Sequence, residues 1–135
     1  MPMTPTASDV STKLRPPAKK SVPWRNPPLT VGTISTGDGL SHLIEAPEGI
    51  DLVEVRLDLL LSNGVAPDKI QEAMAQRSVP ALLTLRTREE GGGFNWRSRQ
   101  RVLFFLKFIP FADVVDLELT NIPRLSRVLR MVRQT

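Results

Sequence analysis

Two apolar segments of this chain end in charged residues whose types and spacing suit the binding of a small polar molecule. Glu54 and Arg56 stand in the segment 51–57, and Arg86 lies near the end of the segment 81–87, four residues before Glu90. An arginine fork binds carboxylates or several hydroxyls at once, and a carboxylate can orient a group or exchange a proton with it. We therefore expect a polar pocket where these two segments end.

Each of these residues also has a structural interpretation, which the sequence leaves open. Residues two apart on a strand point to the same face, so Glu54 and Arg56 could form an ion pair. Arg86 could form a salt bridge with Glu54 instead of binding a ligand. Glu90 precedes three glycines and could be a solvated carboxylate on a tight or mobile loop.

The elements that must position these residues alternate between strand and helix patterns. Extended apolar segments predict strands over residues 29–35, 51–57, 81–87 and 114–119. Spacing and capping patterns predict helices over 40–46, 67–76, 96–108 and from about 123 to the end, the third of them capped by Asn95. The fourth strand repeats the paired charges with Asp116 and Glu118, one of which could face the interior and support the pocket.

Four successive strand–helix units predict an α/β fold with right-handed crossovers and a parallel sheet. The charged ends of the strands then meet at one edge, where open α/β sheets and β/α barrels carry their chemistry. A complete TIM (β/α)8 barrel has about 250 residues. Residues 29–135 therefore supply about the first four units, or the N-terminal half, of such a barrel.

The net charge of +4 is concentrated at the N-terminus. Residues 1–28 contain five basic side chains, one acidic side chain and seven of the twelve prolines. Proline fixes φ and removes a hydrogen-bond donor, so we expect residues 1–28 to be a disordered basic tail, used for docking or targeting. The remaining residues are electrically balanced, which argues against a nucleic-acid partner.

The rest of the composition narrows the class of protein. The chain has no cysteine, which excludes a disulfide framework and a cysteine-based zinc site. No apolar run approaches the roughly 20 residues of a transmembrane helix, and no secretory h-region is evident. We therefore expect a cytoplasmic protein without a membrane partner.

Three motifs taken together resemble type I 3-dehydroquinate dehydratase. They are Glu54-x-Arg56-x-Asp58, Thr84-x-Arg86-Thr87-x-x-Glu90-Gly91-Gly92 and Asp116-x-Glu118-Leu119, in this order within residues 29–135. That family is a TIM barrel of the shikimate pathway, which converts 3-dehydroquinate to 3-dehydroshikimate and water without a metal or other cofactor. The resemblance implies that 3-dehydroquinate is the substrate and that the complete barrel forms a homodimer.

The resemblance also assigns roles to individual residues. It implies that Glu54 and Arg56 hold the ring hydroxyls, that Arg86 is a further substrate-binding residue, and that Glu90 orients the catalytic histidine. In the family a lysine forms a Schiff base with the substrate, and the histidine acts as base and then as acid. Those two residues follow the sixth and fifth strands, so we expect both to be absent here and this chain alone to be inactive. The only histidine, His42, is predicted to lie on a helix surface.

Two other hypotheses remain open. In one, the chain is a non-catalytic half-barrel that binds or assembles with a partner chain, which covers the open edges of its sheet. In the other, it binds nucleic acid through arginines spaced every third residue on the last helix. A solvated helix face is the simpler interpretation of those residues, which are Arg124, Arg127, Arg130 and Arg133.

Overall fold

Four parallel strands form the centre of the fold in the computed structural model, which describes residues 14–93 and 95–135. The strands are hydrogen-bonded in chain order, and every neighbouring pair is parallel. This arrangement confirms the α/β fold with a parallel sheet that the alternating segments predict. The strands are β1 (Val31–Ile34), β2 (Leu52–Arg56), β3 (Ala81–Thr84) and β4 (Val114–Asp116).

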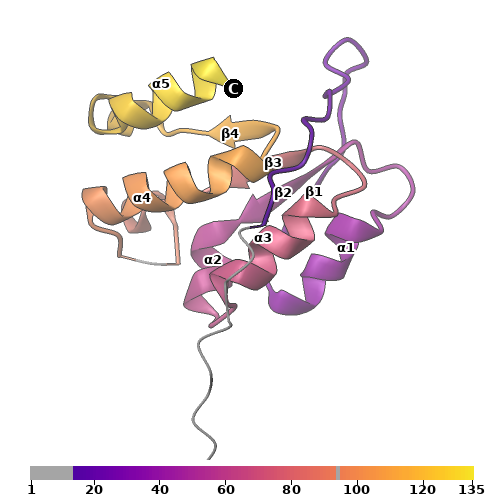
Figure 1. Ribbon diagram of the computed structural model, residues 1–135, viewed down its shortest axis with the longest axis horizontal. Helices are drawn as coiled ribbons and strands as arrows, with labels where there is room; N and C mark the ends of the chain where they lie inside the picture. The colour runs from indigo at the N-terminus through magenta and orange to yellow at the C-terminus, as the bar shows by residue number, and fades with distance from the viewer. Residues whose placement is uncertain (1–13, 94) are drawn as a thin grey trace, which may run out of the picture.

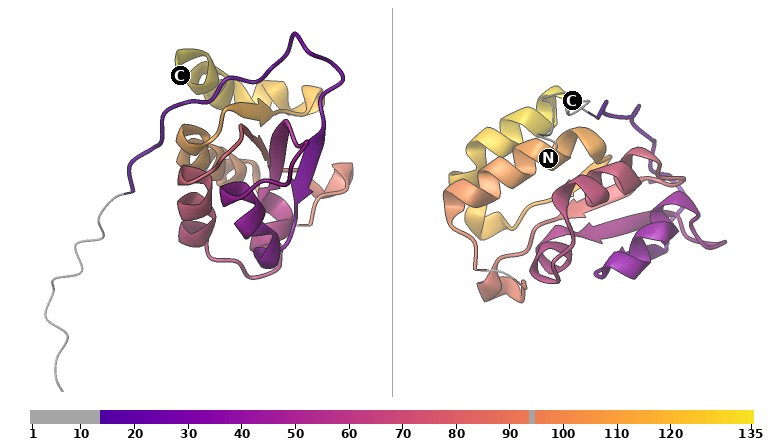
Figure 2. Two further views of the ribbon diagram at one scale, coloured as in Figure 1. Left: turned by 90° about the vertical axis from the view of Figure 1, so that its right-hand side faces the viewer. Right: turned by 60° about the horizontal axis from the view of Figure 1, so that its bottom comes forward.

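Helices connect the strands and lie along one side of the sheet (Figures 1 and 2). Right-handed connections between parallel strands in chain order place every helix on that side. Within the described ranges, no helix is both long and apolar enough to cross a membrane. The α-helices are α1 (Ser41–Ile44), α2 (Leu57–Ser62), α3 (Pro67–Ala75), α4 (Ser98–Phe108) and α5 (Ser126–Gln134). The 3-10 helices are η1 (Gly37–Leu40), η2 (Arg88–Glu90), η3 (Ile109–Phe111) and η4 (Leu119–Leu125).

The hydrophobic core lies between the sheet and these helices. Successive side chains of a strand point to opposite faces, so Val53 and Val55 face the helices while Glu54 and Arg56 face the other way. Val55, like Phe105 and Phe108 of α4, is completely buried in the core cluster. The apolar face of the sheet thus packs on the helices, and the opposite face, which carries Glu54, Arg56 and Asp116, can form a site.

The C-terminal segment 124–133, which covers the end of η4 and most of α5, has the two faces that its sequence predicts. Leu125 and Val128 are buried against the core. The four arginines spaced every third residue are all exposed. This arrangement matches a solvated helix face.

Two predicted helix starts are wrong. The third predicted helix begins at Ser98 rather than Trp96, because the side chain of Gln100 accepts a hydrogen bond from the backbone N–H of Arg97 (3.1 Å) and closes the first turn there. Asn95 therefore does not cap it. The last helix begins at Ser126, because Pro123 lies inside η4 and not at the first turn of an α-helix.

The third and fourth strands are shorter than predicted, and one helix was not predicted at all. β3 ends at Thr84 instead of residue 87, so Arg86 lies just beyond the strand. β4 ends at Asp116 instead of residue 119, and Glu118 turns inward to bond with the end of β3 and with α4. The helix α2 begins at Leu57, directly after β2. Its apolar residues continue the pattern of the strand, so no boundary between strand and helix is visible in the sequence.

Part of the N-terminal segment is ordered against the domain, in contrast to the disorder expected for residues 1–28. The segment 14–28 has no regular strand or helix, as its prolines predict, but it runs past the start of β4 and the end of α5 (Figure 2). Lys19 Nζ donates to the carbonyls of Ile109 (3.0 Å) and Ala112 (2.6 Å), and Lys20 N donates to Asp113 (2.6 Å). These bonds to residues 109–113 hold the segment in place, so the disorder predicted from its composition does not extend to residues 14–28. Residues 1–13 lie outside the described ranges.

Candidate active site at the carboxyl ends of the strands

The charged residues predicted from the sequence stand where β2 and β3 end. Arg56 is the last residue of β2, and its register partner on β3 is Thr84, which in turn pairs with Asp116 at the end of β4. One row across three strands therefore carries a guanidinium, a hydroxyl and a carboxylate. Glu54 lies two residues earlier on the same face of β2.

Arg56 is fixed by Asp58 rather than by the predicted ion pair with Glu54. Its Nε and Nη2 donate to the two oxygens of Asp58 at 3.1 and 2.9 Å, a bidentate geometry. The hydrogen bonds to Asp58 are the main cause of a raised pKa of Arg56. Burial acts in the opposite direction, and the negative charges of Asp58, Glu54 and Asp116 raise the pKa further. Glu54 instead accepts a hydrogen bond from the Thr33 hydroxyl of β1 (3.0 Å), so it is held in the site without neutralising Arg56.

Arg86 pairs with Asp116, so the alternative of a salt bridge to Glu54 is wrong. Its Nη2 bonds to Asp116 Oδ2, and its Nη1 lies 3.8 Å from Glu118 Oε1. The side chains of Arg86 and Asp116 remain 25% and 33% exposed. The guanidinium is therefore anchored on one side and can still receive a ligand on the other.

Glu118 stabilises the same end of the sheet from a nearly buried position. It accepts hydrogen bonds from Thr87 N (3.1 Å), Arg101 Nη2 (2.6 Å) and Asn121 Nδ2 (3.3 Å). Burial raises the pKa of Glu118, but the bonds from Thr87, Arg101 and Asn121 outweigh it and leave the pKa below its usual range. Of the two acids at the carboxyl end of β4, Asp116 contacts Arg86 directly and Glu118 binds the backbone amide of Thr87 beside it.

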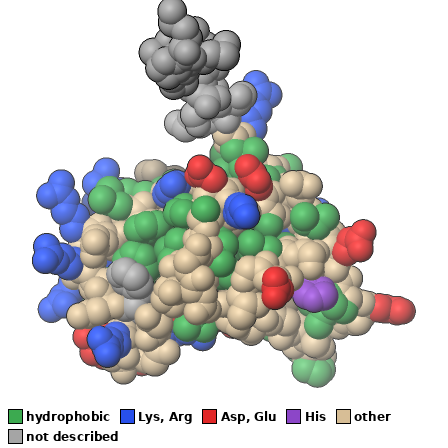
Figure 3. Space-filling model, turned by 90° about the horizontal axis from the view of Figure 1, so that it is seen from below, with side chains coloured by type: hydrophobic (Ala, Val, Ile, Leu, Met, Phe, Trp, Pro, Cys, Tyr) green, Lys and Arg blue, Asp and Glu red, His purple; other side chains and the backbone are tan. Residues whose placement is uncertain are grey.

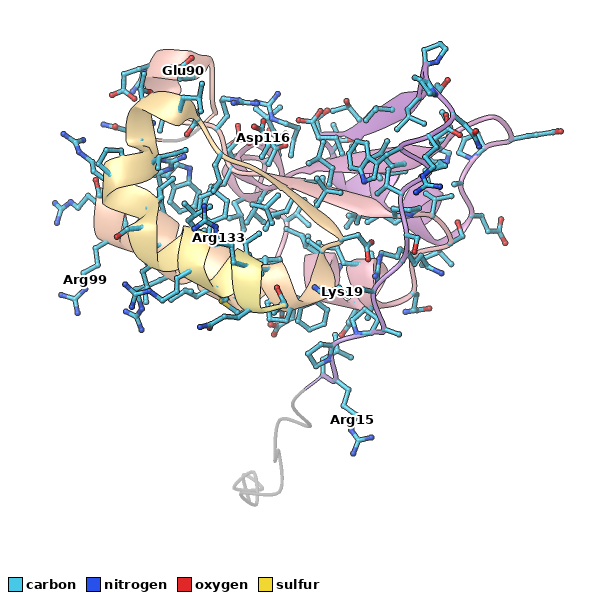
Figure 4. All side chains as sticks on the ribbon, turned by 90° about the horizontal axis from the view of Figure 1, so that it is seen from above. Arg15, Lys19, Glu90, Arg99, Asp116 and Arg133 are labelled. Carbon is cyan, nitrogen blue, oxygen red and sulfur yellow. The ribbon has the colours of Figure 1, made fainter. Side chains whose placement is uncertain are left out.

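Glu90 does not join this group of residues. It lies in η2, its side chain is exposed, and no hydrogen bond or ion pair links that side chain to the described residues. It lines a hollow of about 340 Å³ together with Thr87, Asn121 and Arg124. Figure 4 shows Glu90 on a separate loop, away from Asp116 and at the end of the sheet opposite Lys19.

Two positioning residues carried no predicted role. Asp58 is part of the first motif and is fully buried, and Arg101 of α4 is 4% exposed. A carboxylate two residues after the arginine that ends a strand could have indicated the Arg56–Asp58 pair. The link from Arg101 to Glu118 spans two elements, and nothing in the local sequence indicates it.

Among the described residues, no three histidine, aspartate or glutamate side chains lie together in a group that could hold a metal ion. His42 is exposed on α1 (Figure 3), as predicted. It lies among the residues of a separate hollow beside β1 and η1, which include Gly32 and Gly39.

Acid should destabilise this chain below about pH 5. Burial opposes ionisation of Asp58, Asp113 and Glu118, but their hydrogen bonds outweigh it and hold each pKa below its usual value of about 4. The unfolded chain then binds more protons than the folded chain as the pH falls, so the free energy of unfolding decreases. Guanidinium titrations between pH 3 and 7 should show a plateau above about pH 5 and a decline below it. A steep decline between pH 5 and 7 would contradict the assignment.

Comparison with known proteins shows what this sequence is similar to. The family model described as Type I 3-dehydroquinase matches residues 29–135. A 3-dehydroquinate dehydratase of Methanocella arvoryzae is 34% identical over 93 residues, which cover 69% of this chain and 41% of the relative. The enzyme of Methanothrix thermoacetophila is 38% identical over 72 residues, covering 53% of this chain and 30% of the relative. The chain therefore spans less than half the length of these curated relatives.

Solved structures of 3-dehydroquinate dehydratases from Aquifex aeolicus and Enterococcus faecalis have a similar fold. Their TM-scores are 0.63 and 0.60, at 22% and 23% sequence identity. The matches cover 78% and 79% of this chain and 48% and 49% of those chains. At such identities the likeness establishes the fold and not the roles of single residues.

Proposed function

Because this chain belongs to the type I 3-dehydroquinase family, we propose that the ends of its strands form the substrate-binding half of a 3-dehydroquinate dehydratase. The observation that carries the proposal is the joint placement of Glu54, Arg56 and Arg86 on one face of the sheet, with Asp116 beside them. The whole reaction would convert 3-dehydroquinate to 3-dehydroshikimate and water. The four units described above would be the N-terminal half of the barrel that performs it.

The proposed roles follow from the contacts of each side chain. Arg56 has its guanidinium fixed by Asp58, so it can present its remaining N–H groups to ring hydroxyls at little cost in entropy. Glu54 accepts one bond from Thr33 and keeps further acceptor capacity for a substrate hydroxyl. Arg86 supplies a second guanidinium from the segment that directly follows β3. The buried Thr84 hydroxyl between them has no hydrogen-bond partner in the described ranges, which a bound ligand would provide.

The remaining chemistry would come from a lysine and a histidine supplied by another segment. The amine forms an iminium on the C3 ketone and releases water, and the histidine then removes the C2 proton. The electron pair expels the ring hydroxyl, which takes a proton from the histidine, and water hydrolyses the iminium. His42 is exposed on α1, and Lys69 and Lys107 are exposed on α3 and α4. We propose that this chain alone is inactive and that Glu90 would orient the incoming histidine.

A reconstitution experiment tests this proposal. The 135-residue chain alone should neither turn over 3-dehydroquinate nor give a borohydride-trapped adduct with it. Mixing it with the C-terminal half of the Methanocella arvoryzae relative should restore both, because the catalytic lysine then faces the bound substrate. Mass spectrometry should place the adduct on the added half. An adduct on the isolated chain would contradict the proposed division of roles.

A second candidate function is that of a binding half-barrel that assembles with a partner chain. It is favoured by the two open edges of the sheet. In the described chain the edge strand β1 pairs only with β2, and the edge strand β4 pairs only with β3. Val31 of β1 is also 45% exposed. A stable assembly of defined size in light scattering, together with no activity after reconstitution, would favour this candidate over the first.

A further inference from the structure

Asp58 is a buried carboxylate that binds three separate parts of the candidate site. It is the second residue of α2, and its side chain is fully buried. Its Oδ1 accepts from Arg56 Nε (3.1 Å) and from the backbone N–H of Arg86 (3.3 Å). Its Oδ2 accepts from Arg56 Nη2 (2.9 Å) and from the backbone N–H of Gly93 (3.1 Å). One carboxylate therefore joins the end of β2, the end of β3 and the glycine loop.

The glycine loop is packed tightly against the same residues. A Cβ on Gly92 would collide with the backbone carbonyl of Arg86, and a Cβ on Gly93 would lie 2.7 Å from Leu59 Cδ2 and 2.8 Å from Ser62 Oγ of α2. Gly91 has a positive φ of 85°, which favours glycine. The loop can follow this path only without side chains, and the path brings the Gly93 amide onto Asp58.

The charge of Asp58 holds this junction together. Burial alone would raise the pKa of Asp58, but the hydrogen bonds from Arg56, Gly93 and Arg86 outweigh it and lower the pKa. The carboxylate is thus ionised at neutral pH and has all four bonds satisfied inside the protein. Hydrogen bonds that share one buried charge form a network whose stability can exceed the sum of its separate bonds.

We propose that Asp58 is a positioning residue that couples Arg56 to the loop carrying Glu90. The bidentate geometry of the Arg56 guanidinium and the position of the loop at Gly93 then depend on each other. The consequence for catalysis rests on the proposed function, in which Arg56 binds the substrate and Glu90 orients the histidine. The coupling itself is a property of this chain and can be measured without any activity.

Amide hydrogen exchange by NMR on the 135-residue chain tests the coupling. In Asp58→Asn the charge is lost and an NH2 group replaces one of the two acceptor oxygens. Exchange of the Gly93 amide and of the Arg56 Nε–H should each become about tenfold faster, as expected for lost bonds to a charged group. Asp116→Asn is the matched control, because it removes the partner of Arg86 but touches neither Gly93 nor Arg56. The control should leave Gly93 exchange within about twofold.

A second variant tests the coupling from the other side and does not depend on Asp58→Asn folding. Arg56→Gln should accelerate exchange at Gly93, because the described hydrogen bonds connect Arg56 to Gly93 through Asp58. The same change in the Asp58→Asn background should have no additional effect on Gly93. If Arg56→Gln leaves Gly93 exchange unchanged in the original chain, the two parts bind Asp58 independently and the proposal is overturned.

The functional consequence can be separated from the proposed function itself. In a barrel completed with the C-terminal half of a relative, Asp58→Asn should raise KM through Arg56 and lower kcat through the loop. Arg56→Gln should raise KM more than Asp58→Asn does. If the completed barrel is inactive with Asp58 intact, the proposed function fails, while the exchange measurements still decide whether Asp58 couples the two parts.

Discussion

In a completed barrel, Arg86→Gln should lower kcat/KM for 3-dehydroquinate by about 10²- to 10³-fold. The guanidinium is anchored by Asp116 and the Arg86 side chain is 25% exposed, so its loss removes the positive charge that follows β3 and would leave the Asp116 carboxylate unpaired at the proposed binding site. Hydrogen bonds to charged groups contribute about 1.5–3 kcal/mol each. Losing two bonds near the lower end of that range removes about 3–4 kcal/mol, which at about 1.4 kcal/mol per tenfold corresponds to about 10²- to 10³-fold.

Arg88→Gln is the matched control for this measurement. Arg88 has the same chemistry two residues further along, but it is exposed on η2 and no ion pair links it to the described residues. Its substitution should change kcat/KM by less than about twofold. Steady-state kinetics of both variants, with melting temperatures measured in parallel, separate binding from folding. Equal losses in the two variants would show that Arg86 acts only through the net charge of the site.

The sequence predicts the sheet well because every strand has an apolar face and a turn on each side. Val53 and Val55 alternate with Glu54 and Arg56, and this pattern fixes both the strand and the direction of its charged side chains. The pattern also places Arg86 beside β4, since parallel strands in chain order bring their ends to one edge. Which groups share the site is therefore a consequence of local sequence and topology.

The pairing of charges within the site could not be predicted in the same way. Arg56 has Glu54 and Asp58 at equal distance along the chain, and only the turn from β2 into α2 brings Asp58 back onto the guanidinium. Arg86 pairs across the sheet with Asp116, thirty residues away. Such choices depend on backbone turns and side-chain rotamers that have no signature in composition or spacing.

The ordered part of the N-terminal segment shows a similar limit. Proline content predicts that residues 14–28 form neither helix nor strand, and the structure agrees. Proline content does not predict that this segment packs against the domain, because that packing depends on hydrogen-bond acceptors about ninety residues further along the chain. The carbonyls of Ile109 and Ala112 and the carboxylate of Asp113 receive Lys19 and Lys20. Burial lowers the pKa of Lys19, partly offset by Asp113.

The largest loss of stability should follow Asp113→Ala, at the amino end of β4. The carboxylate accepts from Arg77 Nε and Nη2 (both 2.6 Å) and from the backbone amides of Ala81 (2.8 Å) and Lys20 (2.6 Å). The side chains of Asp113 and Arg77 are 0% and 1% exposed. Alanine would leave a buried guanidinium without its carboxylate, which costs about 3–5 kcal/mol. This is a large part of the total stability of about 5–15 kcal/mol for a domain.

Thermal and guanidinium unfolding should therefore show a fall in Tm on the order of 10–20 °C for Asp113→Ala. Asp68→Ala is the matched control, because Asp68 is 86% exposed and only 4.0 Å from Lys107, and such surface pairs contribute about 0–1 kcal/mol. Adding Arg77→Met to Asp113→Ala should recover part of the loss, since the buried charge is then removed. Similar Tm values for Asp113→Ala and Asp68→Ala would contradict the role of Asp113. Asp113 holds together three segments, the N-terminal segment at Lys20, the turn at Arg77 and the start of β3, so their amides should lose protection together in the Asp113 variant.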